Sequence, residues 1–168
     1  TKSLWNDDKR YIDNYWSVIK DYWVHGDLAS RDADGHWYLH GRSDDTIKVS
    51  GKRIGPSELE SVIVKSGKAK EVAAVGIPDA NKGSKIILSI VPAENNDQKE
   101  SFFVDLVIKD LGKSFKPDKV IFVKDLPKTR NMKIMRRVIK SCLANQDPGD
   151  LSTLLNPESV EEIRSHAI

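Results

Sequence analysis

Residues that could bind an anionic ligand gather in two stretches, and the first runs from Gly41 to Glu60. In it, Arg42 and Arg53 could each hold a phosphate or a carboxylate through paired hydrogen bonds. Gly51 would let the backbone approach such a ligand closely. A charged hairpin with surface ion pairs is the more ordinary interpretation of the same residue types. The stretch therefore indicates either an anion site or a solvated hairpin.

The second stretch, Leu126 to Arg137, is strongly basic. It places Lys133 at the predicted start of a helix, where a loop could present the ammonium to an anionic group. A solvated basic face is the plainer alternative, and an RNA-binding patch is a third. No aromatic residue interleaves with these cations, so stacking on nucleic-acid bases has little support.

Two weaker patterns concern a sugar and a metal. In His25-Gly26-Asp27, the carboxylate after glycine could accept hydrogen bonds from a sugar diol. The acidic run that begins at Asp32 has the Asp-x-Asp-Gly form of an ordinary hairpin turn and lacks the spacing of a calcium loop. His36 and His40 could share one face of a strand, but a third zinc ligand is not near them in sequence. We therefore expect no metal site.

Composition limits the class of protein. The 168 residues are 39% hydrophobic, and 27 basic against 25 acidic side chains leave a formal charge of +2. This balance gives no argument from bulk charge for a nucleic-acid or membrane partner. The single cysteine, Cys142, fits a reducing cytosol, and no apolar run approaches the ~18 residues of a membrane span. We expect a cytoplasmic protein whose true N-terminus lies upstream of Thr1.

Aromatic residues divide the chain near residues 40 to 45. All four Trp and all four Tyr precede residue 40, whereas all four Phe follow residue 100. The spacing of Tyr11, Tyr15, Ile19 and Tyr22 predicts a helix, and Asp34-Gly35 predicts a hairpin turn after it. So many large rings cannot bury one another within about forty residues. We therefore expect that a partner surface is missing.

After that boundary, strands and helices alternate in a pattern typical of a compact α+β domain. Pro56 is expected to open a helix that Gly67 ends. Asn156 with Pro157 is expected to cap a short last helix. The other predicted elements are strands at 46–50, 72–77, 86–91 and 120–123, a turn at Gly51-Lys52, a helix at 102–111, a helix from about Ile134 and a loop over 146–156.

Taken in order, six motifs resemble the closing motifs of the adenylate-forming superfamily, which contains the acyl-CoA synthetases, firefly luciferase and peptide-synthetase adenylation domains. Two outer segments, Arg10 to Tyr22 and Gly149 to Pro157, resemble the acetyl-CoA synthetase branch in particular. The six motifs are His25-Gly26-Asp27, Asp34-Gly35, Gly41-Arg42-x-Asp44-Asp45, Ile47-Lys48-x-x-Gly51-x-Arg53-Ile54, Glu58-x-Glu60 and Pro127-Lys128-Thr129-x-x-x-Lys133-Ile134-Met135-Arg136-Arg137.

The resemblance implies an α+β fold, the small C-terminal lid domain of that superfamily, in which helices flank a short sheet. It assigns residues 1–43 to the end of a large, truncated N-terminal adenylation domain, 44–144 to a mobile catalytic lid and 145–168 to a C-terminal extension. The phosphate loop and acyl pocket of the family lie upstream of these segments. The chain alone is therefore expected to be inactive.

The function implied is that of an ATP-dependent, AMP-forming acid–thiol ligase. A carboxylate, acetate or another short-chain acid, attacks the α-phosphorus of ATP to give an acyl-adenylate and pyrophosphate. The thiol of coenzyme A then displaces AMP. Mg²⁺ is expected to accompany ATP in the complete enzyme, with no metal site in this fragment. A stand-alone lid-like binding module without catalysis is the alternative.

Site residues follow from the resemblance by position. Lys133 matches the lysine that bridges the carboxylate and α-phosphate oxygens, where a positioned cation stabilises the charge that builds up. Its acetylation often switches relatives off, so a protein acetyltransferase and a deacetylase are expected partners. The remaining assignments are Asp27 for the ribose hydroxyls, Arg42 for the ribose or phosphate, Arg53 near the α-phosphate, Asp44 as the hinge and Gly51 in the coenzyme A tunnel.

The chain departs from the family pattern at three places. His25 stands where Thr or Ser is frequent, and Asn131-Met132 stand where Ser-Gly commonly precedes the lysine. Loss of that glycine is expected to stiffen the loop. A basic residue that some relatives use for the coenzyme A phosphates falls on Ile108, with Lys109 as a weak substitute.

Overall fold

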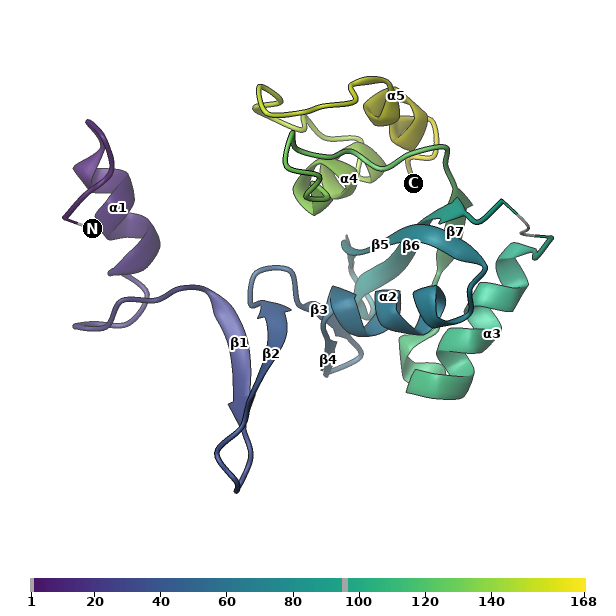
Figure 1. Ribbon diagram of the computed structural model, residues 1–168, viewed down its shortest axis with the longest axis horizontal. Coiled ribbons are helices and arrows are strands. Elements are labelled where there is room, and N and C mark those ends of the chain that lie inside the picture. Colours follow the sequence, from purple (N-terminus) through teal and green to yellow (C-terminus); the bar gives the residue numbers. More distant parts are fainter. Residues whose placement is uncertain (1, 95–96) are drawn as a thin grey trace. The chain divides into compact units, whose positions relative to one another are not determined.

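The computed structural model describes residues 2–94 and 97–168, and the chain forms two compact units that meet in sequence between Asp44 and Asp45. The first contains α1 (Asp8–Tyr15), β1 (Asp27–Arg31) and β2 (Trp37–Arg42) (Figure 1). Among the described residues, no helix combines the length and the apolar character that crossing a membrane requires.

The first helix is shorter than predicted. It ends at Tyr15, so Ile19 and Tyr22 lie outside it and instead form an isolated bridge with each other. The chain turns back because the Trp23 ring stacks on Tyr15, with centroids 5.4 Å apart and planes 10° apart. The Val24 N–H also donates to the Tyr15 carbonyl at 2.8 Å. The helix that the aromatic spacing predicts is therefore present only as far as Tyr15, and its continuation to Tyr22 is wrong.

The predicted hairpin at Asp34-Gly35 is confirmed, with β1 antiparallel to β2. The Asp32 carboxylate holds its turn by accepting from the His36 N–H and the Tyr38 hydroxyl, each at 2.9 Å. The hydrogen bond from the His36 N–H is the main reason that the pKa of Asp32 lies below its ordinary value. Asp-x-Asp-Gly acts here as a turn.

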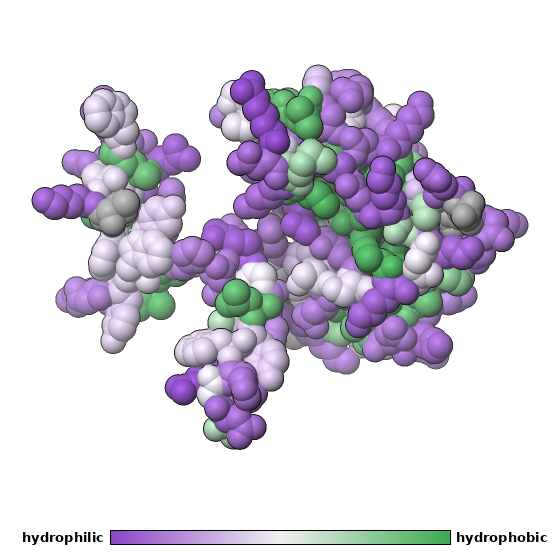
Figure 2. Space-filling view, viewed as in Figure 1, coloured by the Kyte–Doolittle hydropathy of each residue, from purple (hydrophilic) through white to green (hydrophobic). Residues whose placement is uncertain are grey.

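Large apolar and aromatic side chains of the first unit face solvent. Every residue of β1 and β2 is exposed, and pale or green side chains cover much of this unit's visible surface in Figure 2. Trp5 is 93% exposed. The others are Leu4, Ile12, Trp16, Val18, Ile19, Tyr22, Trp23, Leu28, Trp37, Tyr38 and Leu39.

A three-stranded sheet forms the centre of the second unit. β5 pairs with β6 in antiparallel fashion, and β6 pairs with β7 in parallel. Helices α2 and α3 cover one face, and α4 and α5 lie on the other (Figure 1). In chain order the elements are β3 (Ile47–Val49), β4 (Lys52–Ile54), α2 (Pro56–Lys65), β5 (Ala69–Asp79), β6 (Gly83–Pro92), α3 (Glu100–Leu111), η1 (Lys113–Phe115), β7 (Lys119–Phe122), α4 (Arg136–Leu143) and α5 (Glu158–Arg164).

Two hydrophobic cores lie on opposite faces of this sheet. Successive side chains of a strand point to opposite faces, so a strand covered on both sides is apolar almost throughout. Along β6, Ile86, Leu88 and Ile90 join the core beneath α2 and α3, whereas Ile87 and Val91 join the core beneath α4 and α5. This double burial explains why the predicted strands are continuous apolar runs.

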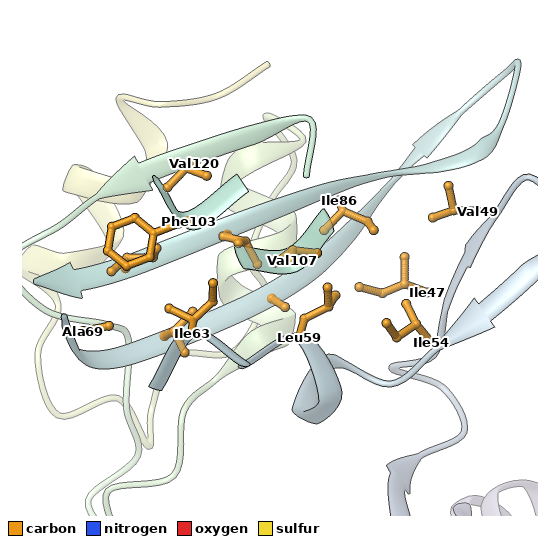
Figure 3. Close-up of a cluster of buried hydrophobic side chains, with 14 residues drawn as sticks. Ile47, Val49, Ile54, Leu59, Ile63, Ala69, Ile86, Phe103, Val107 and Val120 are labelled. Carbon is orange, nitrogen blue, oxygen red and sulfur yellow. The ribbon is translucent and has the colours of Figure 1, made fainter. Parts of the chain in front are cut away.

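The β3–β4 hairpin is anchored on the first core. Figure 3 shows Ile47 and Ile54 gathered with Leu59 of α2 over one face of the sheet. Gly76 permits the close approach, since a Cβ there would lie 2.9 Å from Cγ2 of Ile47. The turn residues are Ser50 and Gly51, with φ of 49° and 81°, rather than Gly51-Lys52 as predicted, because two left-handed residues close this two-residue loop.

An ion pair links α2, on one face of the sheet, to α4, on the other face. Arg136 at the start of α4 donates from Nε and Nη2 to the two carboxylate oxygens of Glu60 on α2, at 2.9 and 2.7 Å. Glu60 also accepts from the Ala74 N–H at 3.0 Å. Burial alone would lower the pKa of Arg136, but the hydrogen bonds and charge of Glu60 outweigh it and raise that pKa.

Replacing Glu60 by Gln should therefore destabilise the chain. The change leaves the half-buried Arg136 charge uncompensated, which we expect to cost about 2–3 kcal/mol of unfolding free energy. Urea denaturation followed by circular dichroism measures the loss. Glu94→Gln, at an exposed position after β6, is the matched control and should change stability by less than about 0.5 kcal/mol. Equal midpoints for the two variants would contradict the role given to this pair.

Candidate functional site

Lys133 lies in a tight turn, and not at the start of a helix as predicted. The Thr129 N–H donates to the Lys133 carbonyl at 2.9 Å, and the Met132 N–H donates to the Thr129 carbonyl at 2.8 Å. The Lys133 N–H donates to Oγ1 of Thr129 at 3.2 Å. Ile134 bridges to Lys128, so α4 begins only at Arg136. The backbone at Lys133 is thus fixed, while its side chain is exposed.

Met132 adopts a backbone conformation that glycine adopts without strain. Its φ is 61°, in the left-handed region, where a residue with a Cβ is disfavoured by roughly 1–2 kcal/mol. This is one of the positions at which the chain departs from the Ser-Gly that commonly precedes the lysine. The turn therefore keeps a glycine-like shape with a methionine in it, and the hydrogen bonds to Thr129 hold it there.

The base of this turn is a buried ion-pair network. Lys128 is 6% exposed, and its Nζ lies 2.5 Å from Oδ1 of Asp125 and 2.6 Å from Oε2 of Glu71. Burial alone would lower the pKa of Lys128, but the two carboxylates outweigh it and raise that pKa. Burial would likewise raise the pKa of Asp125, and the hydrogen bonds from Lys128 and the Leu126 N–H bring it below its ordinary value. Both groups are therefore charged at neutral pH.

Asn156 closes the network from the C-terminal segment. Its amide nitrogen donates to Oδ2 of Asp125 at 2.7 Å and to the Leu126 carbonyl at 2.8 Å. Its amide oxygen accepts from the Lys128 N–H at 3.0 Å. The prediction that Asn156 caps the last helix is wrong, because Pro157 occupies the N-cap position of α5 and the Asn156 side chain serves this network.

The basic stretch is mostly engaged within the protein. Lys128 and Arg136 bind carboxylates, and Arg137 donates to the carbonyls of Pro148 and Asp150, the latter at 2.9 Å. A continuous solvated basic face is therefore wrong, and the RNA-binding alternative loses the observation on which it rested. Lys133 keeps an exposed ammonium among these partnered cations.

A polar pocket lies beside Lys133. Its volume is about 530 Å³, and it is open to solvent. The turn supplies one side and the C-terminal segment supplies the other. The lining residues are Thr129, Arg130, Asn131, Lys133, Ser152 and Thr153. Hydroxyl groups and cations in one pocket are suited to an anionic group.

Gly51 and Arg53 lie on the β3–β4 hairpin of the same unit. Arg53 is exposed and sits directly opposite Lys48 in the register. Like charges placed opposite each other across two strands are unfavourable, so this pair suits a position that receives an anion. A Cβ on Gly51 would meet nothing within 4 Å, but its φ of 81° favours glycine independently of any tunnel.

Asp27, Arg42 and Asp44 come together in the first unit. Asp27 and Arg42 are register partners on β1 and β2, with Nη1 and Oδ1 3.8 Å apart. The same guanidinium donates from Nε to Oδ1 of Asp44 at 3.1 Å and from Nη1 to the His25 carbonyl at 2.9 Å. The His25 ring nitrogen Nδ1 contacts Oδ2 of Asp27. The ring thus occupies one oxygen of the expected ribose-binding carboxylate.

One group of described side chains has ligand atoms near enough together for a metal, namely Asp32, Asp34 and His36, all exposed and within 4.8 Å of one another. Asp32 already accepts hydrogen bonds that close the β1–β2 turn. The arrangement is explained by the hairpin, and we assign it no metal.

Sequence comparisons find similarity to a domain family and to the C-terminal parts of larger ligases. Residues 58–133 match the family model described as the AMP-binding enzyme C-terminal domain. An acetyl-coenzyme A synthetase of Methanothrix thermoacetophila is 42% identical over 96% of the chain and 26% of that protein. A propionate–CoA ligase of Escherichia coli is 37% identical over 97% of the chain and 27% of that protein. The chain thus spans about a quarter of the length of these relatives.

Solved structures agree with this result. ATP-bound MatB from Rhodopseudomonas palustris aligns with 83% of the chain and 27% of its own, with a TM-score of 0.72 and 26% identity. The amide bond synthetase McbA from Marinactinospora thermotolerans aligns with 82% of the chain and 27% of its own, with a TM-score of 0.70 and 27% identity. With the α+β fold, these matches show that residues 58–133 correspond to the AMP-binding enzyme C-terminal domain and that the chain is similar along most of its length to enzymes of the adenylate-forming superfamily.

Proposed function

We propose that the chain is the C-terminal part of an AMP-forming acyl-CoA synthetase that uses ATP, coenzyme A and acetate or another short-chain acid. The observation that carries this proposal is the placement of Lys133: an exposed ammonium on a backbone turn fixed by three hydrogen bonds, between Lys128 and Arg136, which are both paired with carboxylates. Identity to acetyl- and propionyl-CoA-forming ligases over nearly the whole chain supports the substrate class.

The reaction has two steps. First, a carboxylate oxygen of the acid forms a bond to the α-phosphorus of ATP, and the bond from that phosphorus to the leaving pyrophosphate breaks. Lys133 would lie against the carboxylate and α-phosphate oxygens, where its charge offsets the negative charge of the transition state. Second, the thiol sulfur of coenzyme A attacks the acyl carbon, AMP leaves and the thiol proton passes to solvent. Neither step needs a redox reagent.

Other residues take roles in the same scheme. Asp27 would bind the ribose hydroxyls, Arg42 the ribose or phosphate, and Arg53 the region of the α-phosphate. Gly51 would lie along the path of the pantetheine arm of coenzyme A. For Asp27, a ribose diol would replace the contact that the carboxylate makes with His25.

The proposal includes three finer points. ATP enters as its Mg²⁺ complex, with the phosphates rather than this chain supplying most ligands. The exposed Lys133 is a target for a protein acetyltransferase and a deacetylase, because acetylation would remove the charge that the first step needs. The enzyme is cytoplasmic, for which the single, free Cys142 is the support.

The proposed division of the chain has three parts: the end of the adenylation domain (residues 1–43), the lid (44–144) and its extension (145–168). Asp44 is the proposed hinge. The support for the hinge is local. The Ser43 N–H donates to the Gly26 carbonyl at 2.8 Å, which holds the chain to the first unit up to that point, and the second unit begins at Asp45. A hinge at such a point needs only a few backbone torsions.

The 168-residue chain by itself should show no ATP–pyrophosphate exchange with acetate. The phosphate loop and the acyl pocket of the family belong to another domain, so the lysine has no bound substrates to act on. Radiolabelled pyrophosphate exchange measures this, with the complete enzyme as positive control. Robust exchange by the chain alone would refute the assignment as a lid.

Lys133→Ala in the complete enzyme should reduce adenylation by about 10²–10³-fold, because one preorganised charge is lost from the transition state. Thioester formation from supplied acetyl-adenylate should change by less than about threefold, since Lys133 acts in the first step only. Lys140→Ala, at an exposed position on α4, is the control for loss of a surface lysine. Equal losses in both half-reactions would indicate a structural role instead.

Asp44→Pro should separate the half-reactions in a different way. Proline fixes φ near −65° and restricts Ser43, so the lid should be held in one orientation. If that orientation is the adenylation one, acetyl-adenylate still forms but passes slowly to coenzyme A. Pyrophosphate exchange and single-turnover thioester formation on one preparation provide the test. Wild-type rates for both would show that Asp44 is not the hinge.

A further inference from the structure

The C-terminal segment 151–156, here called the tail clamp, lies alongside the first residues of the Lys133 turn. Leu154 bridges to Thr129, and the Leu155 N–H donates to the Lys128 carbonyl at 2.8 Å. Leu151 and Leu154 pack against the core beneath α4 and α5. The tail clamp is therefore anchored at its apolar side chains and bound to the turn through its backbone.

Asn156 ends the tail clamp and is its most constrained side chain. It is 7% exposed, and both ends of its amide are used. The oxygen accepts from the Lys128 N–H, and the nitrogen donates to Asp125 and to the Leu126 carbonyl. One side chain thus holds the backbone that leads into the turn and a carboxylate that neutralises Lys128.

A series of hydrogen bonds and peptide bonds connects Asn156 to Lys133 through Lys128 and Thr129. Lys128 is followed by Thr129, which makes all three hydrogen bonds that close the turn, two through its backbone and one through Oγ1. The strained backbone of Met132 opposes this closure, since its φ of 61° is unfavourable for a residue with a Cβ. The hydrogen bonds of Thr129 thus act against the strain at Met132.

We propose that Asn156 is a positioning residue for Lys133, acting through Lys128 and Thr129, so that the extension takes part in the first half-reaction. This inference rests on the proposed function, because it assumes that Lys133 acts in adenylation. Asn156 touches no substrate. It holds the base of the turn, so that the ammonium reaches the substrate oxygens without reorganisation of its loop. Displacement of a catalytic group by about 1 Å can reduce a rate by up to ~10²-fold.

The test is Asn156→Leu in the complete enzyme, with both half-reactions measured separately. Leucine has the same branching and number of heavy atoms, although it is larger, and it neither donates nor accepts, so the Lys128 N–H, Oδ2 of Asp125 and the Leu126 carbonyl lose the partner that Asn156 supplies. We expect the kcat of pyrophosphate exchange to fall about 10- to 100-fold, with the KM values for ATP and acetate within about twofold. Thioester formation from supplied acetyl-adenylate should stay within about threefold. Asn81→Leu, at an exposed turn position between β5 and β6, is the control and should alter neither rate.

Thr129→Val covers the case in which Asn156→Leu does not fold and loses both half-reactions. Valine keeps the shape of threonine but removes the Oγ1 acceptor for the Lys133 N–H, and the same one-sided loss of adenylation is expected, of about 10-fold. Wild-type adenylation in either folded variant, or equal loss of both half-reactions by Thr129→Val, would overturn the inference.

Lys133→Ala, measured in parallel, separates the failure of this inference from the failure of the proposed function. If it spares adenylation, the proposed function fails, whereas if it abolishes adenylation and the positioning variants do not reduce it, only the inference fails.

Discussion

Lys128 is buried and charged, and the groups that neutralise it also fix the position of the segment that carries Lys133. An unpaired buried ammonium would cost several kcal/mol, so two carboxylates, Asp125 and Glu71, have to lie against it. Glu71 lies on β5, and Asp125 follows β7, so the sheet fixes both. Asn156 supplies the remaining hydrogen bonds of this network from a third part of the chain. The position of the turn is thereby set by the sheet and the C-terminal segment together, and less by the local sequence.

The sheet also ties the two groups of candidate residues in the second unit to one body. The β3–β4 hairpin, which carries Gly51 and Arg53, packs on the core beneath α2 and α3. The Lys133 turn is next to Ile134, which packs against the core beneath α4 and α5. Glu60 joins them, because it binds the backbone of β5 and the guanidinium of Arg136. If the lid rotates between half-reactions, these residues should move as a rigid set. A single rotation could then withdraw the lysine and bring the glycine turn to the coenzyme A path, as the proposed function requires.

Periodicity predicted most elements of the second unit, since apolar runs of strand length and Pro56 at a helix start are local signals. Periodicity did not predict the helix boundaries that tertiary contacts set. The stacking of Trp23 on Tyr15 ended the first helix early, and the bridge of Ile134 to Lys128 delayed α4. In the site, residue types indicated Lys133 as an anion-binding candidate, but partners such as Glu71 and Glu60 are distant in sequence. Asn156 was misassigned because Asn-Pro before a helix is also a capping pattern, and only the position of Asp125 distinguishes the two.

The central claim is that hydrogen bonds to Thr129 hold the Lys133 turn in one conformation before any substrate binds. Native-state amide hydrogen exchange of the 168-residue chain, resolved by residue with NMR, tests it most directly. The account predicts that the amide protons of Thr129, Met132 and Lys133 exchange far more slowly than in an unstructured peptide, while those of Arg130 and Asn131, at the tip of the turn, exchange quickly. Exchange of all five at the unstructured rate would contradict it, because Lys133 would then lie on a mobile loop that nothing positions.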